Sequence, residues 1–253
     1  MSKTRQLHPD GSVAVRTYPV TFLHDVTDGP RTHVWHQLSF AARGHMEVIT
    51  DDARHLVPSD RAVWVPAGTR HTVVMRAPIS VRSLFVAPGA AIVAPDRPRT
   101  IEVTPLLREL ILHISRIGAL DRRRPEQARL VGVLFDLLAA ANSVPLELRS
   151  PRDPRARRFA DLVTKDPGDD APIAKLARKA GASQRTVERC FVTETGMSVG
   201  EWRRRVRLFH ALHLLEAGGT VTDVAYDVGY ASVSAFCQAF ARQFGRSPGR
   251  RRV

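Results

Sequence analysis

Cysteine is nearly absent from this chain, which has only Cys190 and Cys237 among its 253 residues. Two thiols exclude a scaffold held together by several disulfides, and they exclude a zinc site built mainly from cysteines. Both cysteines fall in stretches with helical periodicity and lie close to apolar positions. We therefore expect two small, buried, reduced side chains.

Long apolar runs are also missing. No stretch reaches the length of about 18 apolar residues that a membrane-spanning helix requires. The opening residues, MSKTRQLHPDG, lack the apolar core of an export signal, and no lipid-modification motif or basic amphipathic helix points to a membrane surface. The expectation is a cytoplasmic protein without a membrane partner.

Acidic residues are outnumbered. The chain has 38 Lys and Arg against 25 Asp and Glu, a formal net charge of +13. Residues 151–253 carry more of this excess than the longer segment before them, although 253 residues leave room for two ordinary domains. A strongly basic half predicts a polyanionic partner.

The last hundred residues contain an internal repeat. Residues 172–191 and 221–240 share a pattern of apolar, small and glycine positions. The matched pairs are Leu176 with Val224, Ala177 with Ala225, Gly181 with Gly229, Phe191 with Phe240, Gly196 with Gly245, and Ser198 with Ser247. Each copy reads helix, glycine turn, helix, which predicts two helix-turn-helix motifs at about 172–195 and 221–244.

The second helix of each copy has one apolar and one polar side. In the first copy, Ser183 is an expected N-cap, while Val187, Cys190 and Phe191 supply core positions. The polar side chains predicted to contact DNA are Gln184, Arg185, Thr186 and Arg189 in the first copy, and Ser232, Ser234, Gln238 and Arg242 in the second. Such groups near a helix N-terminus can reach base edges and phosphates of double-stranded DNA.

Residues 199–219, between the copies, predict one long helix of about 30 Å at about 1.5 Å per residue. A rod of that length could hold the two motifs about 34 Å apart, one turn of DNA. Arg203, Arg204 and Arg207 would then contact the DNA backbone. The alternative is that these arginines form a solvated, charged helix face.

Residues 155–250 resemble the DNA-binding domain of the AraC/XylS family of bacterial transcription regulators. The most specific match runs from Val224-Ala225 through Gly229-Tyr230 to Ser247-Pro248. The resemblance implies sequence-specific regulation of transcription at the nucleoid. One departure is that Arg250, Arg251 and Arg252 stand where the family usually has an aromatic residue followed by arginine.

The N-terminal half has a different texture. From Ser12 to about Val86, short β-branched and aromatic runs alternate with Gly, Pro and Asp, which predicts a small β-sandwich or barrel. Strand alternation would place His33, Trp35 and Gln37 on one face. Three other histidines, His36, His45 and His55, are expected at the surface.

This stretch resembles a cupin, a small β-barrel that serves as a sensor in one branch of the AraC/XylS family. Pro66-Ala67-Gly68 would turn the chain and deliver His71 to the barrel mouth. By the resemblance, a metal site would use His33, Gln37 and His71, but Arg31 replaces a further histidine. With only two good ligands left, we expect no metal cofactor and no metal-dependent catalysis.

The remaining set predicts a pocket for a small polar or anionic effector, lined by Arg31, His33, Trp35, Gln37 and His71. The alternative is that the two histidines line the barrel without any ligand. Two amphipathic stretches follow, at about 105–118 and 125–142, and they would pack either on the barrel or on a second subunit. The family resemblance favours a homodimer.

The predicted organisation has two domains. Residues 1–142 would form a small cupin-like β-barrel plus two helices, 143–154 a linker rich in proline and charge, and 155–253 an all-α tandem helix-turn-helix domain. The predicted function is a DNA-binding transcription regulator modulated by a ligand, not an enzyme. Two alternatives remain: a metal-dependent cupin enzyme with accessory DNA binding, and a ligand-independent DNA-binding protein.

Overall fold

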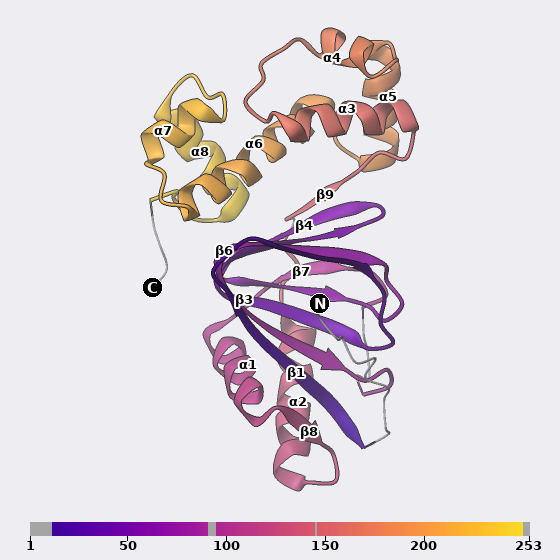
Figure 1. Ribbon diagram of the computed structural model, residues 1–253, viewed down its shortest axis with the longest axis vertical. Helices are drawn as coiled ribbons and strands as arrows, with labels where there is room; N and C mark the ends of the chain where they lie inside the picture. Colours follow the sequence, from indigo (N-terminus) through magenta and orange to yellow (C-terminus); the bar gives the residue numbers. More distant parts are fainter. Residues whose placement is uncertain (1–11, 91–94, 145, 250–253) are drawn as a thin grey trace. The chain divides into compact units, whose positions relative to one another are not determined.

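The computed structural model describes residues 12–90, 95–144 and 146–249. The chain divides into two compact units, Met1–Glu147 and Leu148–Val253 (Figure 1). The first is built on an antiparallel sheet with two helices, and the second is helical, as the sequence predicted. The extreme C-terminal arginines, Arg250 to Arg252, lie outside the described residues.

The sheet of the first unit is centred on two long strands, β3 (His36–Thr50) and β6 (His71–Val86). The other strands are β1 (Val13–Phe22), β2 (Val26–Arg31), β4 (Ala53–Val57), β5 (Arg61–Val65), β7 (Arg99–Glu102) and β8 (Ala119–Asp121). The main path is β7-β5-β3-β6-β1-β8, while β2 pairs with β6 and β4 pairs with β3. The long strands thus change neighbours along their length, which bends the sheet into a barrel-like form.

The bend is centred on Gly44. The register between β3 and β6 is irregular from Ala41 to His45. Gly44 has φ +77°, and a Cβ there would lie 2.7 Å from the carbonyl oxygen of Pro78. Only glycine tolerates both the conformation and the close approach.

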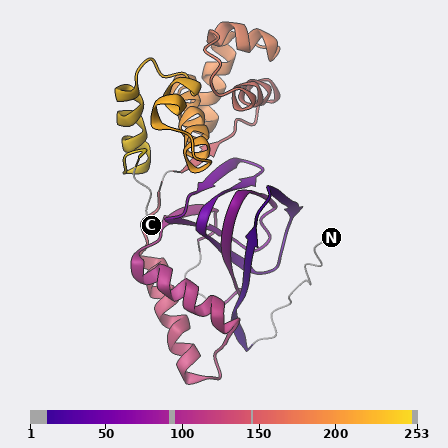
Figure 2. The same ribbon diagram turned by 60° about the vertical axis from the view of Figure 1, so that its left-hand side comes forward.

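Two hydrophobic cores lie on opposite faces of the sheet. Val63 and Val65 of β5 join the interior cluster, whereas Trp64 joins the other, as strand alternation requires. The cluster that contains Trp64 is covered by α1 (Pro105–Ile117) and α2 (Pro125–Ala140), which pack against one face of the sheet (Figure 2). Both amphipathic stretches therefore bury their apolar sides within this chain.

The described part of the second unit contains six helices: α3 (Pro154–Lys165), α4 (Ile173–Lys179), α5 (Gln184–Thr195), α6 (Val199–Glu216), α7 (Val221–Asp227) and α8 (Val233–Phe244). The sequence repeat is confirmed in detail. Ser183 and Ser232 cap α5 and α8 through their side chains, and both helices end at left-handed glycines, Gly196 and Gly245. The connecting helix ends at Glu216, so its length is about 27 Å at about 1.5 Å per residue.

Aromatic side chains hold the helical unit together. Phe191 of α5 meets Phe159 and Trp202 edge to face, with ring centroids 5.6 and 5.3 Å apart. Phe236, Phe240 and Phe244 form the equivalent core of the second motif. Both cysteines are free thiols; Cys190 is buried, as expected, whereas Cys237 is only half-buried.

The exposure of two histidines and the bounds of the linker differ from what the sequence predicted. His45 and His55 are buried, not exposed, since they are 4% and 2% accessible. His55 pairs with Val48 across β3 and β4 and therefore shares the interior face of Val48. Between the units, β9 (Glu147–Arg149) lies at the division at residue 147, so residues 148–154 belong to the helical unit, where we had placed a separate linker.

Candidate nucleic-acid interface and barrel cavity

The exposed side of α5 carries the side chains expected to read DNA. Gln184, Arg185 and Arg189 are exposed, while Val187 on the opposite side is fully buried. Thr186 is half-buried, and its hydroxyl lies 2.9 Å from that of Ser183. The two arginines are therefore the cations that this helix presents to solvent near its N-terminal half.

The equivalent side of α8 is less charged. Ser234, Gln238 and Arg242 are exposed on the side away from the phenylalanine core. The Ser232 hydroxyl accepts the backbone N–H of Ala235 at 3.2 Å, so its first task is to cap the helix. The second motif thus offers hydroxyl and amide groups and one guanidinium group, that of Arg242, whereas the first motif offers two guanidinium groups.

The arginines of α6 point in different directions. Arg204 is exposed. Arg203 donates to the carbonyl oxygens of Ala171 and Asp169 at 3.0 and 2.6 Å, and Arg207 is bound in the same way to the segment between α3 and α4. Burial lowers the pKa of Arg203. The expected DNA-backbone role therefore fits only Arg204, because backbone carbonyls from another part of the chain occupy the other two guanidinium groups.

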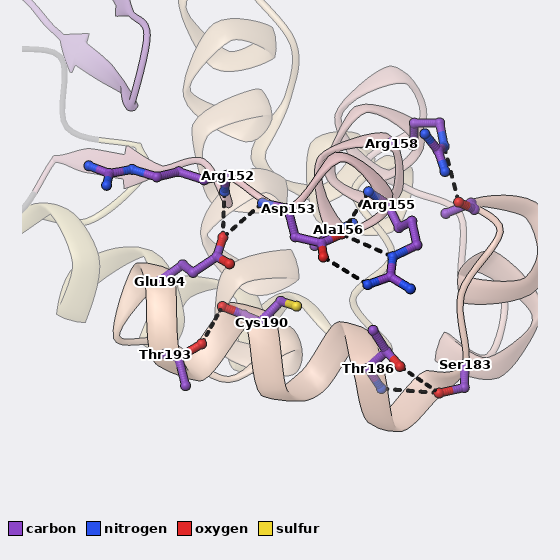
Figure 3. A network of polar contacts seen from close by, with 11 residues as sticks. Arg152, Asp153, Arg155, Ala156, Arg158, Ser183, Thr186, Cys190, Thr193 and Glu194 are labelled. Atoms are coloured by element: carbon purple, nitrogen blue, oxygen red, sulfur yellow. Dashed lines mark hydrogen bonds and ion pairs between the residues drawn. The ribbon is translucent and has the colours of Figure 1, made fainter.

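A second polar network ties the segment before α3 to α5. The carboxylate of Glu194 accepts the backbone N–H groups of Arg152 and Asp153, the latter at 3.1 Å (Figure 3). Asp153 caps α3 by accepting from Arg155 N and Ala156 N, and its hydrogen bond with the Arg155 guanidinium lowers the pKa of its carboxyl. Nothing in the local sequence pattern predicts this role for Glu194, because its partners lie about forty residues earlier in the chain.

The interior of the barrel contains a cavity of about 430 Å³. Most of its wall is apolar and comes from β1, β2, β3 and β6. The lining residues are Tyr18, Val20, Phe22, Val26, Thr27, Asp28, Arg31, Gln37, Ser39, Met46, Val73, Met75, Val81 and Ser83. The polar groups gather along Gln37, Ser39 and Ser83, with the Arg31–Asp28 ion pair nearby. A volume and wall of this kind suit a small molecule with one polar end.

Three polar side chains that line the cavity, those of Gln37, Ser39 and Ser83, belong to a continuous row of hydrogen bonds. His33 Nε2 lies 2.7 Å from Gln37 Oε1, Gln37 Nε2 lies 2.6 Å from Ser39 Oγ, and Ser39 Oγ lies 2.9 Å from Ser83 Oγ. We call these four residues the polar row. At its outer end, His33 Nδ1 lies 2.5 Å from the carbonyl oxygen of Trp35 and must donate to it, because a carbonyl only accepts.

The protonation state of His33 sets the direction of every hydrogen bond in the polar row. Burial lowers the pKa of His33, so the ring is neutral at pH 7 and Nε2 accepts. The Gln37 amide must then turn its NH₂ toward His33 and its oxygen toward Ser39. When His33 is protonated, Nε2 donates and each bond in the row reverses.

His71 lies beside this row, with its ring centroid 5.0 Å from that of His33. Its Nδ1 donates to the carbonyl oxygen of Thr69 at 2.9 Å, which leaves Nε2 as an acceptor. Nε2 is buried and has no hydrogen-bond partner among the residues described. Burial, the largest influence, lowers the pKa of His71 to about 4.

Trp35 does not line the cavity and joins the helix-covered core. The expected alternation began at His33, but β3 begins only at His36, so the rule does not reach back to Trp35. Of the predicted pocket residues, Arg31 and Gln37 line the cavity. His33 and His71 are not among the lining residues; they contact each other, and His33 is hydrogen-bonded to Gln37.

The donor set does not fit a catalytic metal centre. Two imidazoles and one amide are present, Gln37 and His33 are already hydrogen-bonded to each other, and Arg31 brings a positive charge. A catalytic zinc ion needs three protein ligands and an open position. Within the described ranges, no group of three or more His, Cys, Asp or Glu side chains could hold a metal ion. The same ranges contain no helix with the length and hydropathy needed to span a bilayer.

Comparison with known proteins agrees with the helical repeat. A family model described as a helix-turn-helix domain matches residues 176–252. The HTH-type transcriptional regulator NimR of Escherichia coli K12 is 32% identical over 243 residues, which are 96% of this chain and 88% of that protein. The HTH-type transcriptional regulator RipA of Corynebacterium diphtheriae is 31% identical over 142 residues, 56% of this chain and 39% of that protein.

Two solved structures are also similar. ToxT of Vibrio cholerae, with an unsaturated fatty acid bound, has a TM-score of 0.39 at 13% identity and covers 96% of this chain and 95% of its own. A regulator from Chromobacterium violaceum with an AraC-type DNA-binding domain has a TM-score of 0.36 at 21% identity and covers 38% of this chain and 86% of its own. The tandem motif and the relative that matches along nearly the whole length lead to one conclusion: the chain belongs to the AraC/XylS family of HTH-type transcriptional regulators.

Proposed function

We propose that this regulator reads a two-part DNA site by placing α5 and α8 in successive major grooves, and that a small molecule in the barrel modulates this binding at the nucleoid. The observation that carries the proposal is the repeated geometry of the helical unit. Both helices begin at a serine cap, bury one side and expose the other. Two matched faces on one domain suit two neighbouring segments of one duplex.

The first motif supplies the stronger base contacts in this proposal. Arg185 and Arg189 are exposed on α5, and arginine pairs with the major-groove edge of guanine through two parallel hydrogen bonds. On α8, Gln238 can pair with adenine, and Ser234 with either kind of base. Arg204 and Arg242 would contact phosphates, which carry most of the salt-dependent affinity.

Replacing Arg185 by alanine is expected to weaken binding about 5- to 150-fold at sites carrying the preferred base, because a bidentate arginine contributes about 1–3 kcal/mol. Specificity should relax at one or two base pairs. The measurement is selection of genomic fragments by the purified full chain at physiological salt, followed by sequencing. The matched control is Arg116→Ala on α1, where the arginine is also exposed. Uniform weakening across all sequences would instead assign Arg185 to a phosphate.

The same selection tests the proposed function itself. The expected motif has two short conserved segments about one helical turn apart. Retention without any motif, both alone and with cell extract added, would favour the ligand-independent architectural alternative. A motif that appears only with extract would point to the effector.

Modulation by a small molecule rests on the barrel cavity, where an apolar wall ends in the polar row. A ligand that binds the folded state raises its melting temperature. We expect a compound that raises the melting temperature of the wild type to have no such effect on Val20→Phe. This substitution narrows the cavity at a half-buried wall position. Val34→Phe, on an exposed side chain that does not line the cavity, is the control. The proposal fails if active compounds shift Val20→Phe as much as the wild type.

The enzyme alternative requires a metal that the donor set does not suit, and metal analysis of the purified protein tests it directly.

For assembly we propose a homodimer through the helix pair. Leu106 and Ile117 of α1 and Val133 of α2 are 61%, 38% and 42% exposed, so these apolar side chains remain available to a second copy although the rest of each apolar side is buried within this chain. Sedimentation of the full chain tests this, and a monomer at micromolar concentration contradicts it.

A further inference from the structure

The guanidinium of Arg207 is surrounded by acceptors from two distant parts of the helical unit. In the segment between α3 and α4, it donates to the carbonyl oxygens of Pro167 and Asp169, at 3.1 and 3.3 Å, and to the carboxylate of Asp170 at 3.1 Å. In the turn of the second motif, it donates to the carbonyl oxygen of Gly229 at 3.3 Å. One side chain thus bridges the segment that leads into the first motif and the turn of the second.

The same two segments also touch each other directly. A Cβ added at Gly168 would lie 2.6 Å from the carbonyl oxygen of Asp227, a distance that real side chains do not reach. At Gly229, which has φ +80°, an added Cβ would lie 3.2 Å from the carbonyl oxygen of Gly168 and 3.1 Å from Arg207 Cζ. The backbone contact is therefore close because both positions are glycine.

Arg203 supports the contact from one helical turn earlier on α6. Its bonds to Asp169 and Ala171 hold the other end of the same segment. Together the two arginines place residues 167–171 against α6, and Arg207 alone extends the network to Gly229. The link consists mostly of backbone carbonyls, and Asp170 adds little because its side chain is 91% exposed.

Only an arginine can satisfy this set of acceptors. The guanidinium presents five donors in a planar fork, whereas the lysine ammonium is a compact point charge. The Arg207 side chain is 17% exposed, so its donors are committed inside the protein. A phosphate contact would require neither the fork nor this burial.

We propose that Arg207, supported by Arg203, is a positioning residue that fixes the distance and orientation between the two recognition helices and so selects the spacing of the two-part DNA site. The inference rests on the proposed reading of two grooves by α5 and α8. It assigns Arg207 to specificity through geometry and leaves contact with the DNA backbone to Arg204.

The test compares Arg207→Lys with Arg204→Lys and Arg204→Ala in the full chain. Sites selected by the wild type are rebuilt with one or two base pairs added or removed between the segments. The wild type should prefer one spacing by at least about tenfold, and Arg207→Lys should reduce this preference to within about threefold. Arg204→Ala should keep the preference, weaken all sites similarly and lower the salt slope by about one. The proposal is overturned if Arg207→Lys keeps the wild-type spacing preference.

A second variant guards against simple misfolding. Gly168→Ala retains both arginines but forces the two segments apart at Asp227. It should broaden the spacing preference in the same way as Arg207→Lys, with α5 and α8 still folded by circular dichroism. Unchanged spacing in a folded Gly168→Ala protein would contradict the proposed link.

Hydrogen exchange without DNA separates this inference from the proposed function. In Arg207→Lys, the amides of residues 168–171 and 227–230 should exchange faster together, by about tenfold or more, with little change in Arg204→Lys. If these segments loosen together but the wild type shows no spacing preference, the two-groove reading fails and the link stands. If only one segment or neither responds, the link itself is wrong.

Discussion

Replacing Trp202 by alanine is expected to lower the free energy of unfolding of the helical unit by about 3–5 kcal/mol, typical of a large aromatic removed from a core. The side chain is 2% exposed and packs edge to face on Phe191. Its Nε1 also donates to the carbonyl oxygen of Arg149 at 2.8 Å, so the substitution leaves that acceptor without its donor. One side chain thus joins α6, the core of the first motif and the segment before α3.

The measurement is urea unfolding of the full chain followed by circular dichroism in the helical band. Trp202→Phe is the matched variant: it keeps a ring against Phe191 and loses the indole N–H, so a smaller loss is expected. The barrel unit should unfold as in the wild type, because the substitution lies outside it. Its unfolding is followed by the fluorescence of Trp35 and Trp64, which lie in its own core. A loss below about 1 kcal/mol for Trp202→Ala would show that the ring is not central to the fold.

The second large effect concerns acid. His71 has its pKa lowered to about 4 in the folded protein, against an ordinary value of 6.5. Between these values the unfolded chain binds a proton that the folded chain excludes. Stability is therefore fully present above pH 6.5 and is lost as the pH falls toward 4, by at most about 3 kcal/mol from this residue. His33, whose pKa is also lowered by burial, adds in the same direction.

Unfolding of the barrel unit measured at pH 7, 5.5 and 4.5 tests this expectation. His71→Gln removes the titrating group, so its stability should fall less steeply over this range than that of the wild type. His24→Gln, at an exposed position, is the matched control for the substitution itself. Parallel slopes for the wild type and His71→Gln would mean that His71 gains its proton as easily folded as unfolded.

The helical unit could be predicted closely from the sequence because its signals are local. Apolar spacing, the capping serines Ser183 and Ser232 and the turn glycines Gly181 and Gly229 each act within one or two turns of chain. The roles of Arg203 and Arg207 could not be read in this way. Their partners are mostly backbone carbonyls of residues 167–171, which lie more than thirty residues before the two arginines, and periodicity along α6 carries no information about that segment.

In the barrel, the strands and two members of the polar row, His33 and Gln37, could be predicted from the sequence, but the geometry of the row could not. Alternation of side chains between the two faces holds only inside a strand. Because β3 begins at His36, alternation does not apply to Trp35, which lies in the helix-covered core. The bulge around Gly44 lies next to the unexpectedly buried His45. Ser39 and Ser83 meet because β3 and β6 pair in that register, a contact between residues far apart in the chain.

The polar row also has a thermodynamic consequence for whatever binds beside Ser83. With His33 neutral, the row orders so that the Ser83 hydroxyl donates to Ser39 and its lone pairs face the cavity; with His33 protonated, Ser83 is free to donate into the cavity. A ligand that donates a hydrogen bond there therefore favours the unprotonated barrel and binds more tightly as the pH rises, and one that only accepts drives proton uptake and binds more tightly as the pH falls. The ligand affinity thus depends on pH through His33, which the ligand does not contact. Whether the affinity rises or falls with pH shows whether the effector donates or accepts the hydrogen bond at Ser83.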